Sequence, residues 1–431
     1  MEAAFDLTEP ADLSNTSAAV ASPRITSIDA VRGLVMFTMI FVNDIAGASA
    51  DIVPAWMRHF HGDDGMTFVD LVFPAFLFIV GMSIPFALGG RIAKGEPWWK
   101  CLAHILTRTL ALLCLGVVMV NGLPDSSQMG WSAGLWSALV LLSVGLWLGS
   151  FSLPGQSKFS ADRRRVLRIV GALLHVVGFA GLVGLVLAYR GREGLRIVTL
   201  SPFSLHSEWW GILGLIGWAY LVSSLVFLFF RTRSTALLAC MTLLFCLYPA
   251  GQSGLFDELT ISQYVGIGGM IGSHGGIAVA GMLLASVLIH PETRSSRSRI
   301  RFTLLFALGC AAGAVLIDGL YGINKNAATP AWCLWACAIT AAVWLIVHLL
   351  SETRVGRWLT GPFAVAGRNV LLAYLLSNAL GPVLDLLNLG DWYGGLAGPT
   401  LTNAVARSVG VAVVILLVSV GLNRLGLRLK L

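Results

Sequence analysis

The chain has 431 residues, of which 56% are hydrophobic and only 12% are charged, and its mean hydropathy is +0.80. Soluble globular domains carry about 25% charged residues, so this composition excludes an ordinary soluble protein. The formal net charge of +7 does not indicate nucleic-acid binding, because the basic residues fall in short loops between apolar stretches. The long, continuous apolar runs exclude the alternating strands of a barrel and predict an all-α, polytopic integral membrane protein.

The first 23 residues are small, polar and acidic. They contain neither the basic region nor the apolar core of a signal peptide, and they lack the apolar residues needed to fold. We therefore expect residues 1–23 to form a disordered cytoplasmic tail and residues 24–431 to form a single transmembrane domain.

Apolar runs recur along the rest of the chain and predict about twelve transmembrane helices, within a range of ten to twelve. Their expected ranges are 28–46, 67–89, 101–121, 131–151, 166–189, 207–230, 235–250, 272–290, 302–320, 331–350, 363–382 and 403–425.

Charge alternates between the loops that join these spans. Every second loop is basic, and these loops hold Arg91, Lys94, Lys100, Lys158, Arg163, Arg164, Arg165, Arg231, Arg233, Arg294, Arg297, Arg299, Arg301, Arg354, Arg357, Arg424, Arg428 and Lys430. The opposite loops hold Asp51, Asp63, Asp64, Asp125, Asp257, Glu258 and Asp391. By the positive-inside rule the basic loops and both termini face the cytoplasm, and only the arginines within 190–206 break the alternation.

The first span carries polar residues at both ends. Asp29 and Arg32 are three residues apart on one helix face and can pair near the cytoplasmic end. Asn43 and Asp44 follow one turn before the outer end, about 20 Å further along the helix axis. The Asp29–Arg32 pair is either structural or part of a site for an anionic ligand, and the sequence leaves both possibilities open.

The loop before the second span holds a titratable cluster from His59 to Asp64, on the side that we expect to face away from the cytoplasm. Asp70 begins the second span, three residues after Thr67. It either closes a capping box with Thr67 or orients a nearby histidine by fixing its tautomer.

Other polar residues lie where apolar ones are expected. In the third span Arg108 follows His104 by one turn, and it either contacts an anion or extends toward lipid head groups. Lys325 lies between two asparagines at an outer helix end, and Asn326 follows it. The seven cysteines form no CxxC pair and no histidines have metal-binding spacing, so no metal site is predicted.

Four polar residues cluster near the start of the eleventh span. Arg368 and Asn369 lie at its cytoplasmic end, and Tyr374 and Ser377 follow at helical spacing. Polar groups at membrane depth are costly, so this group is a candidate part of a binding site.

The segments RITSIDAVRGLVMFTMIFVND (24–44) and HFHGDDGMTFVDLVFPAFLFIVGMSIPF (59–86) together resemble the heparan-α-glucosaminide N-acetyltransferase superfamily of transmembrane acyltransferases. They are most similar to bacterial inner-membrane proteins of that superfamily linked with N-acetylglucosamine utilisation. WWGILGLIGWAYL (209–221) and INKNAATPAW (323–332) resemble further family blocks, so the resemblance covers roughly residues 24–380.

The resemblance implies a multi-pass protein of the bacterial inner membrane that moves acetyl groups from cytoplasmic acetyl-CoA to the amino group of glucosamine or a glucosaminide on the periplasmic side. The family's essential histidine matches His59, which follows Trp56-Met57-Arg58. Because the spacing from His59 to Asp70 is one residue longer than in the lysosomal pattern, His61 is a competing candidate. The family asparagine falls on Asn43.

Acyl transfer to an amine needs a base, donors for the oxyanion and cations for the phosphates of CoA. We expect catalytic roles for His59 or His61, Asp70 and Asn43, and direct transfer rather than an acetyl-histidine intermediate, because direct transfer needs one fewer step. The expected acetyl-CoA site comprises Arg32, Arg108, Arg368, Asn369, Tyr374 and Ser377. The expected amino-sugar site comprises Asp44, Asp64, Lys325 and Asn326.

Other functions are compatible with the same residues. An inner-membrane transporter of amino sugars or their oligosaccharides would also place a polar cluster at the outer face, although few carboxylates lie in mid-span for proton coupling. Two further alternatives are a non-catalytic scaffold subunit and an acyltransferase whose acceptor is a sugar hydroxyl group. The small residues from Gly266 to Gly281 suit close helix packing within the chain or between two copies in a homodimer.

Overall fold

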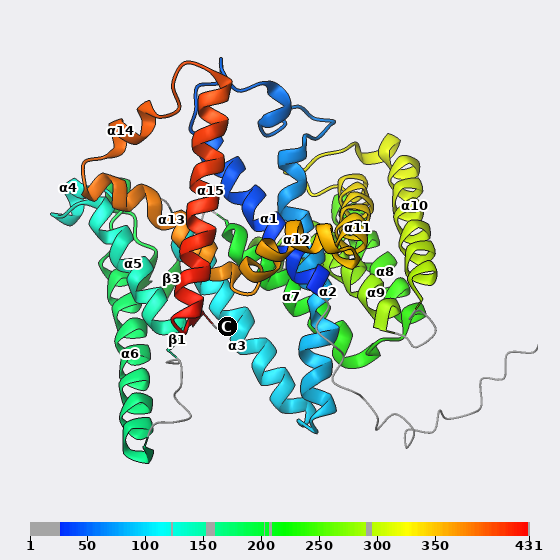
Figure 1. Ribbon diagram of the computed structural model, residues 1–431, viewed down its shortest axis with the longest axis horizontal. Coiled ribbons are helices and arrows are strands. Elements are labelled where there is room, and N and C mark those ends of the chain that lie inside the picture. The colour runs from blue at the N-terminus through cyan, green and yellow to red at the C-terminus, as the bar shows by residue number, and fades with distance from the viewer. Residues whose placement is uncertain are drawn as a thin grey trace, which may run out of the picture.

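The computed structural model describes residues 26–121, 124–151, 160–201, 203–206, 209–289 and 295–429, and these residues form a bundle of helices (Figure 1). The prediction of an all-α, polytopic membrane protein is confirmed. The predicted tail, residues 1–23, lies outside the described residues.

Fifteen α-helices follow one another along the described residues. They are α1 (Thr26–Ile45), α2 (Val72–Ala93), α3 (Trp98–Val120), α4 (Ser126–Met129), α5 (Ala133–Leu148), α6 (Ala161–Ala188), α7 (Gly211–Phe230), α8 (Ser234–Gln252), α9 (Gly275–Ile289), α10 (Ser296–Tyr321), α11 (Pro330–Glu352), α12 (Arg354–Ala366), α13 (Val370–Leu386), α14 (Gly390–Gly395) and α15 (Leu401–Arg424).

Shorter elements complete the fold. Four 3-10 helices are η1 (Ala55–Met57), η2 (Phe68–Leu71), η4 (Arg192–Gly194) and η5 (Thr260–Gln263), and a π-helix, η6 (Ile267–His274), leads into α9. The strands are β1 (Gly149–Phe151), β2 (Val198–Leu200), β3 (Phe203–Leu205) and β4 (Leu427–Leu429). Strand β1 pairs with β4 and β2 with β3, both antiparallel, with Gly149 opposite Leu429 and Val198 opposite Leu205.

Each of the twelve predicted spans overlaps a helix. Within the described residues, however, nine helices are long and apolar enough to cross a membrane, or ten if α12 and α13 count as one. Helix α5, with 16 residues, is shorter than a typical span. The number twelve therefore stays a prediction, as does the side of the membrane on which the termini lie.

The prediction of one continuous helix over 363–382 is wrong, because the chain turns by 72° between α12 and α13. At the turn Gly367 packs directly against the backbone of α1, where a Cβ atom would lie 1.9 Å from the carbonyl oxygen of Asp29. Asn369 then bonds to the backbone of Leu427 and Leu429 in β4, at 3.4 Å each. The bend thus joins the first and last described elements of the chain.

The core of the bundle is the segment formed by η6 and α9. In its most apolar window 94% of the residues are buried, compared with 11% for α6 and 17% each for α8 and α10. Helix α9 carries apolar or small residues on every side, so it has no polar face to turn outward. Of the small-residue stretch Gly266–Gly281, the part from Gly272 onward is buried inside the chain, whereas Gly266 is exposed. A Cβ atom on Gly281 would lie 2.0 Å from the Phe78 carbonyl oxygen of α2.

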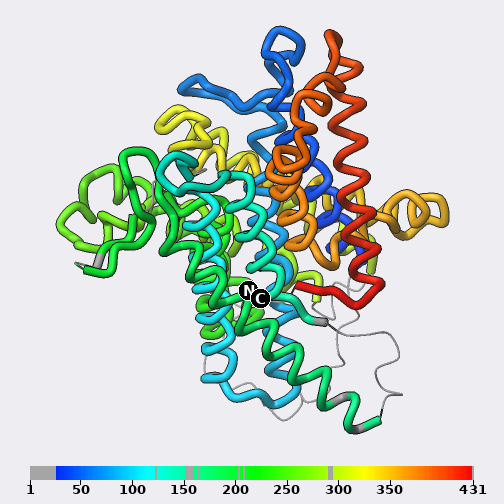
Figure 2. Tube along the Cα trace, turned by 90° about the vertical axis from the view of Figure 1, so that its left-hand side faces the viewer, coloured from blue at the N-terminus to red at the C-terminus, as the bar shows by residue number. Residues whose placement is uncertain are grey.

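The loop between α1 and α2 and the start of α15 lie at one end of the bundle, and the turn between α2 and α3 lies at the other (Figures 1 and 2). We call these the outer end and the basic end, after the charge pattern of their loops. Helix α1 begins beside α12, near the middle of the bundle, and leads into the loop at the outer end (Figure 1).

The crossing of α1 and α12 yields a test of the fold. A Cβ atom on Gly33 would lie 2.0 Å from the Phe363 carbonyl oxygen, whereas nothing lies within 4 Å of one on Gly361, in the same α12. We expect Gly33→Ala to destabilise the protein by about 1–3 kcal/mol, because backbone must move to admit the methyl group. The thermal unfolding midpoint of the detergent-solubilised protein measures the effect.

Gly361→Ala is the matched control. It should leave the midpoint unchanged or raise it slightly, since alanine is the better helix former. Equal midpoints for Gly33→Ala and wild type would contradict the close crossing.

Candidate functional site

Asp70 anchors the outer cluster. Its side chain is 1% exposed, and its Oδ2 atom accepts hydrogen bonds at 3.0 Å from the backbone N–H groups of Phe60 and Thr67. Thr67 Oγ1 accepts from Val69 N and donates to the Arg58 carbonyl oxygen at 2.7 Å. The capping box predicted for Thr67 and Asp70 is confirmed, and it also folds the preceding loop back onto the start of η2.

The other oxygen of the same carboxylate orients a histidine. Asp70 Oδ1 lies 2.8 Å from His59 Nδ1, and the imidazole is 44% exposed, whereas Asp70 is buried. Both functions considered for Asp70 therefore coexist, because its two oxygens have different partners. His61 is exposed and makes no hydrogen bond to Asp70 in the described structure, so the geometry favours His59 as the oriented histidine.

Lys325 joins these two residues from a distant part of the sequence. Its Nζ atom lies 2.9 Å from His59 Nδ1 and 3.1 Å from Asp70 Oδ1, and its side chain is 26% exposed. The expectation that Lys325 lies on the same side as the histidines is confirmed. We call His59, Asp70 and Lys325 the outer triad.

Backbone contacts hold the lysine loop, residues 322–329, against the histidine loop. Asp64 Oδ1 accepts from Ile323 N at 2.7 Å, and Gly65 N donates to the Ile323 carbonyl oxygen at 2.8 Å. Asn324 Nδ2 donates to the Asp63 carbonyl oxygen at 3.2 Å. Asp64, predicted to contact the sugar, thus already has a partner within the protein.

Asn324 also shapes the lysine loop itself. Its Oδ1 atom accepts from Ala327 N, and its backbone N–H donates to the Thr329 hydroxyl oxygen, both at 3.0 Å. Sequence analysis did not select Asn324, although its place directly before Lys325 was a signal. Asn326, which it did select, is exposed on the same loop.

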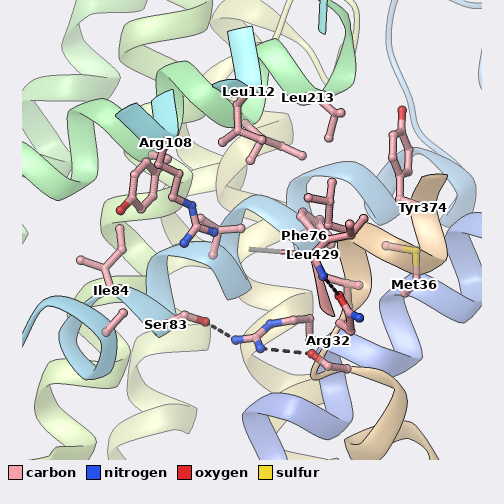
Figure 3. A pocket seen from close by; sticks show the side chains of 18 of the residues that line it. Arg32, Met36, Phe76, Ser83, Ile84, Arg108, Leu112, Leu213, Tyr374 and Leu429 are labelled. Carbon is pink, nitrogen blue, oxygen red and sulfur yellow. Dashed lines mark hydrogen bonds between the residues drawn. The ribbon is translucent and has the colours of Figure 1, made fainter. Parts of the chain in front are cut away.

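A cavity of about 480 Å³ opens among α1, α2, α3, α7 and α13 (Figure 3). Five of the six residues expected to bind acetyl-CoA line it, namely Arg32, Arg108, Arg368, Asn369 and Tyr374. Arg91, His104 and Tyr220 also line this cavity, although the sequence did not predict them as part of the acetyl-CoA site. We call this space the basic cavity.

The basic cavity is polar at one end and apolar at the other. Along α2 its lining runs from Arg91, at the basic end, to Phe76, a distance of about 22 Å. Met39 of α1 and Leu112 of α3 belong to its apolar part. Such a cavity suits a ligand that carries anionic groups at one end and a less polar arm at the other.

Arg32 is held by several groups at once. Its Nη1 atom lies 3.0 Å from Asp29 Oδ1 and 3.2 Å from the Gly367 carbonyl oxygen, and Nη2 donates to Ser83 Oγ (Figure 3). The predicted Asp29–Arg32 pair is confirmed. Because Asp29 offsets its charge, Arg32 contributes less net positive potential to the cavity than its type suggests.

Arg108 is placed differently. Its guanidinium carbon lies 4.6 Å from the centre of the Tyr220 ring, and its buried Nε atom has no hydrogen-bond partner in the described structure (Figure 3). A buried donor without an acceptor is costly, so this N–H is suited to an anionic ligand in the cavity.

A second cavity, of about 440 Å³, lies further along α1 and α13 toward the outer end. Its lining includes Asn43 and Asp44, expected from the sequence, and Asn378 and Asp385. Ser377, predicted to bind acetyl-CoA, lines this cavity and not the basic one. We call it the outer cavity.

Asp44 is already engaged within the protein. Its Oδ2 atom accepts from Arg407 Nε at 3.0 Å and from Ser408 Oγ at 2.6 Å, and Tyr393 donates to its other oxygen. Burial and the neighbouring carboxylate raise the pKa of Tyr393 above its ordinary value. Sequence analysis missed Arg407, although an arginine inside a predicted span signals a buried counter-charge.

Neither cavity is lined by His59 or His61. Along α2 the basic cavity ends at Phe76, six residues and about 9 Å from Asp70. Asn43 faces the outer cavity, whereas Ile45, two residues later, packs against Val53 and Met57 beside the histidine loop. Two residues turn a helix by about 200°, so Asn43 and Ile45 lie on opposite sides of α1.

The described residues contain no group of three or more His, Cys, Asp or Glu side chains that could hold a metal ion.

A family model and two known proteins match parts of this chain. Residues 24–190 match a domain of unknown function named DUF5009. Heparan-alpha-glucosaminide N-acetyltransferase from Homo sapiens is 24% identical over 391 residues, which cover 82% of this chain and 52% of the human protein. The Mus musculus protein of the same name is 36% identical over 98 residues, 23% of this chain and 14% of its own length. The chain thus spans about half the length of the human relative.

The connections of Asp70 can be tested through stability. In Asp70→Ala the N–H groups of Phe60 and Thr67 lose their bonds to a carboxylate, and a hydrogen bond to a charged group contributes about 1.5–3 kcal/mol. We expect a clearly lower unfolding midpoint and faster proteolysis of the histidine loop. Asp51→Ala, which removes an exposed carboxylate from the same loop, should change neither measurement. Similar behaviour of the two variants would show that Asp70 does not anchor the loop.

Proposed function

We propose that this chain, as a member of the heparan-α-glucosaminide N-acetyltransferase superfamily, transfers an acetyl group from acetyl-CoA to the amino group of glucosamine or a glucosaminide. Similarity to these relatives supports a transmembrane acetyltransferase. The donor would enter the basic cavity from the cytoplasm, and the acceptor would approach the outer triad from the periplasm of a bacterial cell.

The orientation of His59 by Asp70 is the observation that carries this proposal. An amine attacks a thioester only in its neutral form, so a base must take its proton. When Nδ1–H donates to Asp70, the lone pair of Nε2 is free, and the half-exposed imidazole can meet an acceptor from outside. The buried carboxylate also stabilises the imidazolium that forms.

In the proposed reaction the amine nitrogen forms a bond to the acetyl carbonyl carbon, and His59 takes the proton from nitrogen. The carbon–sulfur bond breaks, and the departing thiolate takes that proton from His59, so CoA leaves as a thiol and the base is restored. We propose this direct transfer, without an acetyl-histidine intermediate. Asn43 remains the sequence-based candidate for a donor to the oxyanion, although it faces the outer cavity.

The basic cavity supports the donor site. Its arginines suit the phosphates of CoA, and its apolar part, from Leu112 to Phe76, suits the pantetheine arm. The arm would have to extend about 9 Å beyond Phe76, along α2, to bring the thioester to the outer triad. The proposal thus requires a path to open between Phe76 and His59 when the donor binds.

Release of CoA by the purified protein tests the proposal. The full chain in detergent, with acetyl-CoA and glucosamine, should produce CoA and N-acetylglucosamine in equal amounts, measured by mass spectrometry. His59→Ala should lower kcat about 10²–10⁴-fold, the usual contribution of a general base. His61→Ala, which removes an exposed histidine two residues away, should retain most activity.

Two other outcomes have clear meanings. If wild type releases no CoA but binds glucosamine, the transporter alternative gains support. If His61→Ala loses activity and His59→Ala keeps it, the assignment of the base is wrong.

Arg108 gives a separate test of the donor site. Loss of one charge-assisted contact to a phosphate should raise KM for acetyl-CoA roughly 10-fold, about 1.4 kcal/mol, in Arg108→Met. KM for glucosamine should not change. Arg354→Met, which removes an exposed arginine of α12 outside the cavity, is the control and should match wild type. Unchanged KM for acetyl-CoA in Arg108→Met would place the donor elsewhere.

A further inference from the structure

The outer triad contains a conflict that its distances reveal. His59 Nδ1, Asp70 Oδ1 and Lys325 Nζ form a triangle with sides of 2.8, 2.9 and 3.1 Å. Each side is short enough for a hydrogen bond. A neutral imidazole, however, offers one position at Nδ1, which holds either a hydrogen or a lone pair.

Both tautomers leave one side of the triangle unfavourable. If Nδ1 carries the hydrogen, it donates to Asp70, but the ammonium of Lys325 then faces another donor. If Nδ1 carries the lone pair, Lys325 donates to it, but two acceptors then face each other at 2.8 Å. One partner must turn away before all remaining contacts are favourable.

Lys325 is the partner that can turn away. Asp70 is buried, and its other oxygen is bound by two backbone N–H groups. The Lys325 side chain is long, flexible and partly exposed. The backbone of its loop is fixed, because Ile323 bonds to Asp64 and Asn324 bonds to Asp63. The loop therefore brings the Lys325 ammonium to the imidazole but does not prevent the Lys325 side chain from changing rotamer.

We propose that Lys325 is a positioning residue that couples the tautomer of His59 to the presence of the acceptor. Without acceptor, the ammonium lies within hydrogen-bond distance of both Nδ1 and Asp70 Oδ1, and its charge offsets the repulsion between these two acceptors. The proton of the imidazole then resides on Nε2, where a base needs a lone pair. When an acceptor hydroxyl binds Lys325, the ammonium leaves Nδ1. Nδ1–H then donates to Asp70 and Nε2 becomes a base.

This inference rests on the proposed function and extends it to the regulation of the same site. Such coupling would protect acetyl-CoA from water. In hydrolysis, water adds to the acetyl carbonyl carbon, the carbon–sulfur bond breaks, and acetate and CoA leave; His59 would serve as the base for that water too. A base that forms only with acceptor bound favours transfer over hydrolysis.

Nitrogen NMR of the full chain tests the tautomer directly. Protein labelled with ¹⁵N-histidine is measured in detergent at a pH where imidazole is neutral, and the His59 signals are assigned by their loss in His59→Gln. We expect the Nε2–H form to dominate in wild type and the Nδ1–H form in Lys325→Met. Added glucosamine should shift wild type toward the Nδ1–H form, and Lys325→Arg should resemble wild type.

Two further variants keep the test decisive. Lys100→Met removes an exposed lysine at the basic end and should leave the His59 signals unchanged. Asp64→Ala loosens the lysine loop without altering Lys325, and it should shift the signals partway toward those of Lys325→Met, even if the latter does not fold. The inference is overturned if the His59 signals of Lys325→Met match those of wild type. If Lys325→Met does not fold, wild-type signals in Asp64→Ala overturn it instead.

Kinetics give an independent reading. Acceptor-free hydrolysis of acetyl-CoA should rise several-fold in Lys325→Met, and the stimulation of CoA release by glucosamine should fall, whereas Lys325→Arg should retain coupling. Suppose that wild type acetylates glucosamine, but Lys325→Met changes neither the ratio of hydrolysis to transfer nor the tautomer of His59. In that case only the role of Lys325 fails. If wild type transfers no acetyl group, the proposed function fails, whatever the NMR result.

Discussion

The buried carboxylate of Asp70 is the interaction on which the outer end of the molecule depends. One of its oxygens binds two backbone N–H groups, and the other lies within hydrogen-bond distance of His59 and Lys325. Burial of an ionised carboxylate is unfavourable unless donors surround it, and here four groups converge on it. The same requirement explains why the loop after α1 folds back and why the lysine loop docks there. A site assembled around one buried charge is well ordered where an exposed loop would otherwise be mobile.

Helix α1 also carries a paired carboxylate near each of its two ends. Near the start of the helix, Asp29 pairs with Arg32 at 3.0 Å, and near its end Asp44 pairs with Arg407 at 3.0 Å. Charged side chains are expensive in a bilayer unless they are paired, so each pair permits polar cavities beside α1 without an isolated charge. The two cavities lie one after the other along α1 and α13. Arg32 and Met39 line the basic cavity, and Asn43 lines the outer one.

The close contact between α1 and the bend after α12 determines the shape of the basic cavity. Gly33 and Gly367 allow the two backbones to meet, and the turn that follows exposes Arg368 and Asn369 to the cavity instead of burying them in a straight helix. In membranes, small residues at helix crossings supply close packing that apolar burial alone does not provide. The bend also holds β4, so the C-terminal segment contributes Leu429 to the cavity lining.

The sequence by itself determined the class of the fold, the approximate positions of most helices and the polar residues that merited attention. These properties follow from local hydropathy, from charge in the loops and from spacing along a helix, as the Thr67–Asp70 cap and the Asp29–Arg32 pair show. Only the tertiary structure decided which distant residues meet. It paired Lys325 with His59 and Arg407 with Asp44, placed Asn43 in a cavity that His59 does not line, and broke the span over 363–382. Those outcomes depend on how helices cross and on which buried charges find partners, and neither is encoded in a local pattern.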